Sequence, residues 1–191
     1  MGRPKQALPV ARQNGGSEEE PLLRHAARAA VESPTRPVVV VLGEGADSLT
    51  PHIADLPVHS VAHSGWARGI GSSIKIGLEC LTALAPTLDA VILSVCDQPH
   101  LSAATFSRLG RAYRGSDALI VASAYGGVAG VPALFDRSVF SELQALDDRD
   151  GARVLIDRDA ERVVTVPFPL GAIDLDTPEA YEAYLRAGVR N

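Results

Sequence analysis

Apolar residues along the chain form short uninterrupted runs, separated by longer stretches in which they recur every three or four positions. The strongest runs are residues 37–43, which are mostly valine, and residues 90–96. A continuous β-branched run of this kind is typical of a strand buried on both faces, so residues 37–43 are expected in the middle of a parallel sheet. Shorter runs predict strands at residues 58–62, 119–122 and 163–166.

The stretches with spaced apolar positions predict helices between these strands. One helix begins at Pro21, a residue that suits a first helical turn, and a second covers residues 70–81 and ends before Pro86. Ser102 can cap a third helix. Further helical patterns cover residues 138–146, 152–156 and 178–185.

Strands that alternate with helices imply right-handed βαβ units. We therefore expect an α/β fold of three layers, with helices on both faces of a mostly parallel, Rossmann-like sheet. The chain has 191 residues, 46% of them hydrophobic and 21% charged, which is the composition of a globular protein. No repeat or long linker divides it, so residues 1–191 are interpreted as a single domain. Residues 13–20 are interpreted as a solvated loop with a wet acidic surface.

Charge and cysteine content narrow the classes of partner and the compartment. A net charge of −5 disfavours a surface built for nucleic-acid phosphates or anionic lipid, so small-molecule or protein partners are favoured. Cys80 and Cys96 lie in apolar runs without CxxC spacing, as buried thiols of a reducing compartment do. The longest apolar run is far shorter than the ~20 residues that span a bilayer. No signal peptide opens the chain, and we expect a cytoplasmic location.

Asp97 is the sharpest candidate for chemistry. It directly follows a predicted buried strand, at the carboxyl edge where open α/β sheets bind ligands. A carboxylate at this edge can coordinate Mg²⁺, which takes oxygen ligands and bridges to substrate phosphates. Asp97 can equally cap the turn that precedes the helix at Ser102. Its position alone leaves both interpretations open.

Five segments, in order along nearly the whole chain, resemble motifs of the molybdenum cofactor cytidylyltransferase group within the MobA-like NTP transferases. Residues 1–8 (MGRPKQAL) resemble the end of the signature L-A-A-G-x-S-x-R-M-G-x-P-K-x-L-L, and residues 65–74 (GWARGIGSSI) resemble W-x-x-G-M-x-S-S. The other three segments are residues 96–99 (CDQP), which resemble C-D-Q-P, residues 127–135 (GVAGVPALF), which resemble G-x-x-G-x-P-x-L-F, and residues 174–179 (DLDTPE), which resemble D-I-D-T-P-E.

The resemblance implies a nucleotidyl transfer. In that group a phosphate monoester, that of molybdopterin, attacks the α-phosphate of CTP and expels pyrophosphate. Such a step depends on in-line positioning and on neutralisation of phosphate oxygens by Mg²⁺ and cationic side chains. The implied partners are CTP, a phosphorylated small-molecule acceptor, and a molybdenum hydroxylase or its chaperone.

The resemblance also implies roles for four charged residues. Lys5 reaches the triphosphate, and Asp97 holds Mg²⁺ and with it the nucleotide. Asp174 or Asp176 supplies a second carboxylate for the metal. Plainer interpretations stay open: Lys5 is a solvated lysine near a terminus, and either later aspartate caps the last helix, for which Asp176 is the better placed.

A glycine-rich turn is implied to lie against the nucleotide. Gly69 and Gly71 allow close backbone approach, while the amides and hydroxyls of Ser72 and Ser73 offer donors. The same segment can be an ordinary helix N-terminus capped by serine. Trp66, just before it, is interpreted as a packing residue rather than a stacking platform.

The resemblance finally sets an expectation for what precedes Met1. The family places its first strand and the loop L-A-A-G-x-S-x-R there, and that loop would cradle the triphosphate. We expect a longer natural protein whose start was assigned at an internal methionine; a truncated inactive relative and a strand supplied by a partner chain are the alternatives. The first strand would be central, so without it two neighbours stay unpaired and transfer is expected to be lost. A non-catalytic nucleotide-binding or interaction domain, and a transferase for another phosphorylated acceptor, are competing functions.

Overall fold

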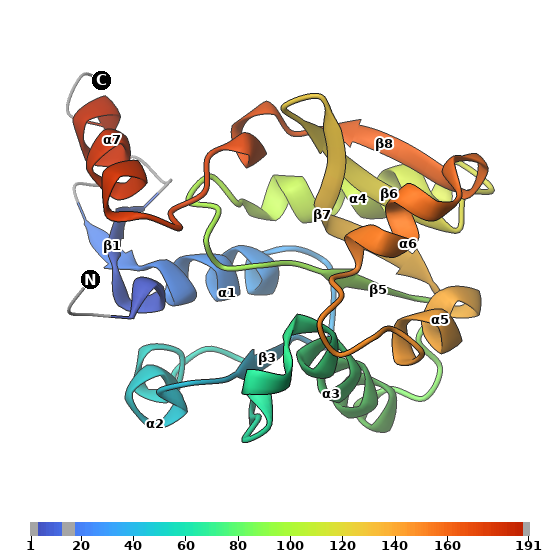
Figure 1. The fold of residues 1–191 in the computed structure, drawn as a ribbon, viewed down its shortest axis with the longest axis horizontal. Coiled ribbons are helices and arrows are strands. Elements are labelled where there is room, and N and C mark those ends of the chain that lie inside the picture. The colour runs from blue at the N-terminus through green and yellow to red at the C-terminus, as the bar shows by residue number, and fades with distance from the viewer. Residues whose placement is uncertain (1–3, 13–17, 189–191) are drawn as a thin grey trace.

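The computed structural model describes residues 4–12 and 18–188 (Figure 1). The strands are β1 (Pro9–Ala11), β2 (Glu19–Pro21), β3 (Val39–Leu42), β4 (His59–Ala62), β5 (Ala90–Leu93), β6 (Ile120–Tyr125), β7 (Val128–Asp136) and β8 (Val163–Pro167). The α-helices are α1 (Leu22–Glu32), α2 (Ala46–Leu49), α3 (Ile70–Leu84), α4 (Ala103–Arg114), α5 (Phe140–Gln144), α6 (Arg153–Arg158) and α7 (Pro178–Gly188). The 3-10 turns are η1 (Lys5–Ala7), η2 (Thr50–His52), η3 (Trp66–Arg68), η4 (Arg137–Val139), η5 (Ala160–Arg162) and η6 (Pro169–Ala172).

The predicted α/β architecture of three layers is confirmed. The largest sheet has the order β5-β7-β6-β8, and β7 runs antiparallel to both of its neighbours while β6 and β8 are parallel. Strands β5, β6 and β8 therefore share one direction. Alternate residues point to opposite faces of a strand: Val91 and Phe135 pack toward α3, α5 and α6, whereas Ile92 and Leu134 pack toward α4.

The predicted helices form where their apolar spacing lies. The first begins at Leu22, one residue after Pro21, and α3 ends at Leu84, just before Pro86. Ser102 caps α4 as predicted, because its hydroxyl accepts a hydrogen bond from the amide of Thr105. Among the described residues, no helix is long and apolar enough to cross a membrane.

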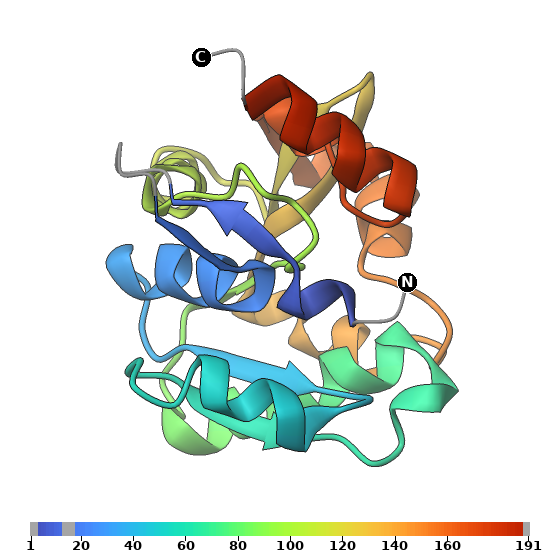
Figure 2. The ribbon, with the colours of Figure 1, turned by 90° about the vertical axis from the view of Figure 1, so that its left-hand side faces the viewer.

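The position predicted for the valine-rich strand is wrong. Strand β3 is hydrogen-bonded only to β4 among the described strands, in a separate two-stranded parallel sheet (Figure 2). Helices α1 and α3 nevertheless pack against both sheets. In α1, Ala27 lies in one cluster with Leu42 of β3, and Ala29 lies in another with Ile92 of β5. In α3, Gly77 lies against Val41 of β3, and Leu78 clusters with Val91 of β5. The two strands thus lie between the same two helices without pairing with each other.

Strand β7 was not predicted. Gly126 and Gly127 both adopt positive φ (57° and 79°), which permits the tight hairpin that joins β6 to β7. The pairing of β6 with β7 shifts register after Ala122, and Val131 and Pro132 lie in this irregularity. Proline has no amide to give to a ladder, so it is tolerated inside the sheet at such a bulge.

The expectation of a wet acidic surface is wrong for Glu20. Strands β1 and β2 form an antiparallel hairpin, in which Glu20 pairs with the buried Val10. The Glu20 carboxylate is buried against α1, where it accepts hydrogen bonds from Arg28 and contacts Nδ1 of His25 at 3.1 Å. Residues 13–17 of the same patch lie outside the described residues.

Candidate functional site

Three segments that are distant in sequence meet at one lysine. The Nζ atom of Lys5 donates to Oδ2 of Asp97 at 2.9 Å and to Oδ1 of Asp176. Lys5 lies in η1, which is anchored because the amide of Leu22 donates to the carbonyl of Leu8 at 2.9 Å. The side chains of Lys5 and Asp97 are 33% and 18% exposed, so this ion pair is partly shielded from water.

The backbone of Asp97 fixes the second carboxylate segment. Strand β5 ends at Leu93, and the chain continues without regular structure to Asp97, whose carbonyl accepts a hydrogen bond from the amide of Leu175 at 2.9 Å. Leu175 is fully buried beside Val10. Asp174 and Asp176 therefore flank a residue that is held on both its backbone and its side chain.

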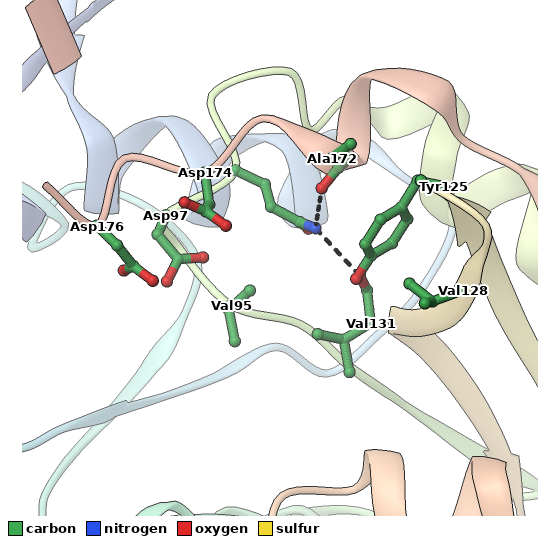
Figure 3. Close-up of a pocket in the computed structure, with 11 residues that line it drawn as sticks. Val95, Asp97, Tyr125, Val128, Val131, Ala172, Asp174 and Asp176 are labelled. Atoms are coloured by element: carbon green, nitrogen blue, oxygen red, sulfur yellow. Dashed lines mark hydrogen bonds between the residues drawn. The ribbon is translucent and has the colours of Figure 1, made fainter. Parts of the chain in front are cut away.

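These carboxylates form one wall of a cavity of about 330 Å³ (Figure 3). Asp97, Asp174 and Asp176 lie together on one side, and Tyr125 and Val131 lie opposite them. The full lining is Val95, Asp97, Gln98, Tyr125, Gly126, Val128, Val131, Gly171, Ala172, Asp174 and Asp176. The cavity thus joins an acidic wall to an apolar wall.

Gln98 is a buried polar residue of this cavity that the sequence argument missed. Its Nε2 donates to the carbonyls of Gly171 at 2.9 Å and Val131 at 3.2 Å, and the residue is 3% exposed. Its Oε1 has no hydrogen-bond partner among the described residues. In the sequence Gln98 stands out only as part of residues 96–99 (CDQP), because both carbonyls that it binds belong to distant segments.

Burial and charge shift the pKa values around the cavity. Burial alone would lower the pKa of Lys5, but hydrogen bonds to Asp176 and Asp97 and the charge of both carboxylates outweigh it and raise that pKa above its usual value. The side chain of Lys5 is therefore protonated and positively charged at neutral pH. Burial, aided by the charge of Asp97, raises the pKa of the Cys96 thiol to about 11.

The last helix is capped by neither aspartate. The amide of Ala180 donates to Oγ1 of Thr177 at 3.1 Å, so Thr177 caps α7 and the alternative interpretation of Asp174 or Asp176 as the cap is wrong. A threonine at this position satisfies an amide of the first turn. The carboxylate of Asp176 is left to pair with Lys5.

The glycine-rich turn lies elsewhere and is occupied by the chain itself. The amides of Gly71 and Ser72 donate to the carbonyl of Asp148, at 2.9 and 3.4 Å. Ser72 is buried, donates its hydroxyl to the carbonyl of Gly69 and contacts Nε2 of His63. A loop carbonyl thus accepts from the first amides of α3, where no side chain caps, so the alternative interpretation of this turn as a serine-capped helix start is wrong.

The cavity and the turn are separate features. Gly69, Gly71, Ser72 and Ser73 are not part of the cavity lining, whereas Asp97, Asp174 and Asp176 are. Lys5 is brought to the carboxylates by η1, while residues 1–3 of the same motif lie outside the described residues. Trp66, before the turn, packs its Cβ against Gly43 and remains 41% exposed.

The chain has clear relatives among known folds. The MobA-like NTP transferase domain model matches residues 1–163. A homologue of Mycobacterium tuberculosis Rv0371c, from Mycobacterium sp. strain JC1, is 28% identical with a TM-score of 0.78 over 100% of this chain and 90% of that one. No curated protein matches the chain at a significant level.

Two more distant crystal structures share the fold. Rv0371c of Mycobacterium tuberculosis H37Rv, in complex with manganese, is 23% identical with a TM-score of 0.73 over 97% of this chain and 93% of that one. The 4-diphosphocytidyl-2C-methyl-D-erythritol synthase of Anaerococcus prevotii is 16% identical, with a TM-score of 0.72 over 90% and 87%. The match over most of its length shows that the chain belongs to the family of MobA-like NTP transferase domains, which are nucleotidyltransferases.

Proposed function

We propose that this domain transfers CMP from CTP to a phosphate monoester, such as that of molybdopterin, and releases pyrophosphate. The observation that carries this proposal is the convergence of Lys5, Asp97 and Asp176 at the wall of a cavity next to the sheet edge. Nucleotidyl transfer needs both kinds of charge at one place, cations for the phosphates and carboxylates for a metal ion.

Lys5 is the residue that we propose for the triphosphate. Its ammonium is held by carboxylates alone in the described structure, at the end of a flexible four-carbon chain. Phosphate oxygens compete well for such a donor, and a turn of the side chain exchanges its carboxylate partners for them. Lys5 would then neutralise charge as pyrophosphate departs.

Two carboxylates of this wall suit a divalent metal ion, although the described residues contain no group of three or more Asp, Glu, His or Cys side chains placed to hold one. Carboxylate oxygens are the ligands that Mg²⁺ prefers, and those of Asp97 and Asp176 already converge on one cationic group, with Asp174 on the same wall. We propose that Asp97 holds Mg²⁺ together with Asp174 or Asp176. The ion would neutralise phosphate oxygens of the nucleotide. The manganese complex of the structural neighbour supports divalent metal use.

The apolar side of the cavity supports an acceptor with more than a phosphate to bind. Val95, Val128 and Val131 offer contact area, and Tyr125 offers a ring edge. The acceptor's phosphate oxygen would attack the α-phosphate of CTP from this side while the bond to the β-phosphate breaks. A neighbour that forms a cytidyl product supports CTP as the donor. The protein that receives the product would be a molybdenum hydroxylase or its chaperone.

The glycine-rich turn can contact the nucleotide only if a neighbouring loop moves away from it. We propose that Gly69, Gly71, Ser72 and Ser73 lie against the nucleotide, but two amides of this turn are bonded to Asp148. The loop of residues 147–150 would have to move before those amides could bind phosphate. Lys75, which pairs with Asp148 at 2.8 Å, holds this loop in place.

The direct test is pyrophosphate release from CTP with Mg²⁺ or Mn²⁺ and a series of phosphorylated acceptors. Asp97→Asn should lower the rate about 100-fold, the usual scale for a lost electrostatic contact to the transition state. Asp47→Asn is the matched control, because Asp47 is exposed on α2, outside the cavity lining. Measurable and equal rates for Asp97→Asn and wild type would exclude the proposed role of Asp97. No turnover by the wild type itself would instead agree with the loss of transfer expected of a domain without the L-A-A-G-x-S-x-R loop.

The competing functions give different results in the same assay. Metal-dependent CTP binding that is lost in Asp97→Asn, without turnover on any acceptor, would indicate a non-catalytic nucleotide-binding domain. Turnover with a sugar or alcohol phosphate but not with molybdopterin would indicate another transferase. Turnover with a different nucleoside triphosphate would correct the base.

A further inference from the structure

The ammonium of Lys5 lies between the carboxylates that would hold a metal ion. It donates to Asp97 at 2.9 Å and to Asp176 as well, so both acids direct an oxygen at one point. Among the described residues, Lys5 is the one cation that forms ion pairs with either of them. The ammonium of Lys5 therefore occupies the position between these two carboxylates that would best suit a metal ion.

This arrangement makes two cations rivals. Two carboxylates that share one site repel each other unless a positive charge lies between them. An ammonium and a divalent ion cannot both lie there, because they would repel each other in turn. Binding of the ion must therefore displace Lys5, and displacement leaves the ammonium needing a new anionic partner.

A triphosphate is the partner that can receive the displaced lysine. We propose that Lys5 occupies the cation position in the free protein and makes tight binding of a divalent ion depend on bound nucleotide. The inference rests on the proposed function, since nucleotide is what draws Lys5 from Asp97 and Asp176. Coupling of this kind is reciprocal, so bound cation also favours nucleotide. The protein without nucleotide would then bind a divalent ion only weakly.

The test measures binding of Mn²⁺ alone to the nucleotide-free protein, by electron paramagnetic resonance of the unbound ion. Lys5→Met removes the rival charge and should tighten Mn²⁺ binding about ten-fold, within the usual range of coupling between sites. Lys75→Met is the matched control. Lys75 is the other of the chain's two lysines and is likewise paired with a carboxylate, Asp148, outside the cavity lining. The Lys75→Met variant should bind Mn²⁺ as tightly as the wild type does.

A double variant locates the bound ion. The gain in Lys5→Met should disappear when Asp97→Asn is added, because the ion loses a ligand. A gain that survives in the double variant would mean that the ion binds elsewhere, and this would overturn the inference. So would equal or weaker Mn²⁺ binding by Lys5→Met. If Lys5→Met does not fold, Lys5→Gln makes the same comparison.

The outcome is separable from that of the proposed reaction. Tighter Mn²⁺ binding by Lys5→Met in a protein without CMP transfer to any acceptor would support the rivalry and reject the reaction. Transfer that requires Asp97, together with unchanged Mn²⁺ binding by Lys5→Met, would support the reaction and reject the rivalry. The metal measurement uses no substrate, so neither result depends on the other assay.

Discussion

The side-chain amide of Gln98 lies 2.9 Å from the carbonyl oxygen of Gly171, to which it donates a hydrogen bond. The same nitrogen also donates to the carbonyl of Val131 in β7. One side chain thus ties the turn that carries Asp97 to a neighbouring strand and to η6. Since η6 leads directly into the segment of Asp174, Gln98 supports the spacing of the acidic wall.

Replacing Gln98 by methionine should destabilise the domain by about 2 kcal/mol, because the buried carbonyl of Gly171 loses the donor Gln98 and that of Val131 keeps only the hydroxyl of Tyr125. Methionine keeps the volume, so little of the loss comes from packing. Urea denaturation of both proteins measures the difference. Gln144→Met serves as control, since Gln144 makes a single longer contact, at 3.3 Å, in a less buried place. A urea midpoint for Gln98→Met equal to that of Gln144→Met would show that the two hydrogen bonds of Gln98 do not stabilise the domain.

The buried Glu20 should make stability depend on acid. Burial alone would raise the pKa of Glu20, but hydrogen bonds from Arg28 and His25 outweigh burial and lower it below 4.5. A carboxyl whose pKa is lower in the folded state stabilises the fold above its unfolded pKa. That stabilisation should be complete above pH 4.5 and lost as pH falls through the lower folded value.

The variant Glu20→Gln should cost about 2 kcal/mol at neutral pH, since Arg28 keeps its charge and loses the buried one of its two carboxylate partners, with only the more exposed Glu32 remaining. It should also show a smaller loss of unfolding free energy than the wild type as pH falls below 4.5. Unfolding free energies measured across this range decide the matter. Parallel curves for the two proteins would mean that Glu20 is not the group responsible.

The thiol of Cys96 should be unreactive although it lies next to the candidate site. Burial and the nearby charge of Asp97 raise its pKa to about 11, so only about one thiol in a thousand is ionised at about pH 8. The thiolate is the nucleophile in alkylation. Iodoacetamide should therefore label Cys96 much more slowly in the folded protein than in urea, as mass spectrometry of the labelled peptide would show. Equal rates would contradict the pKa.

Part of the site was open to sequence reasoning, and part was not. Asp97 could be found because a carboxylate that follows a buried strand lies at the ligand-binding edge of a sheet. Its contact with Lys5 spans 92 residues, and that of Lys5 with Asp176 spans 171. No periodicity reports such distances, so these contacts entered only through the resemblance. The hydrogen bonds of Gln98 could not be predicted, because its partners are backbone carbonyls, which every residue has and which leave no pattern in the sequence.

The same distinction applies to the sheet. Gly126 and Gly127 are a readable hairpin signal between β6 and β7. Proline is uncommon inside a strand, and only the register shift explains why Pro132 is tolerated there. The valine run of β3 was correctly predicted as a strand, since β-branched residues favour extended backbone. Which strands pair with it depends on residues distant in the sequence, and a run of valines does not predict these partners.

The edge of β3 that faces away from β4 can be identified from hydrogen bonds. The carbonyls of Val38 and Leu42 accept from His59 and His63. Backbone groups of a strand alternate between its two edges, so residues 38, 40 and 42 face β4. The amides of Val39 and Val41 therefore point to the other edge, where no described strand pairs with β3.

Hydrogen exchange should distinguish the two edges within this one strand. The amide of Val41 should exchange at least about ten-fold faster than those of Val40 and Leu42, because a ladder hydrogen bond protects only the latter two. Exchange followed residue by residue by NMR measures this directly, with Val40 as the internal control for burial and side-chain type. Equal protection of Val40 and Val41 would mean that a further strand pairs with β3 in solution.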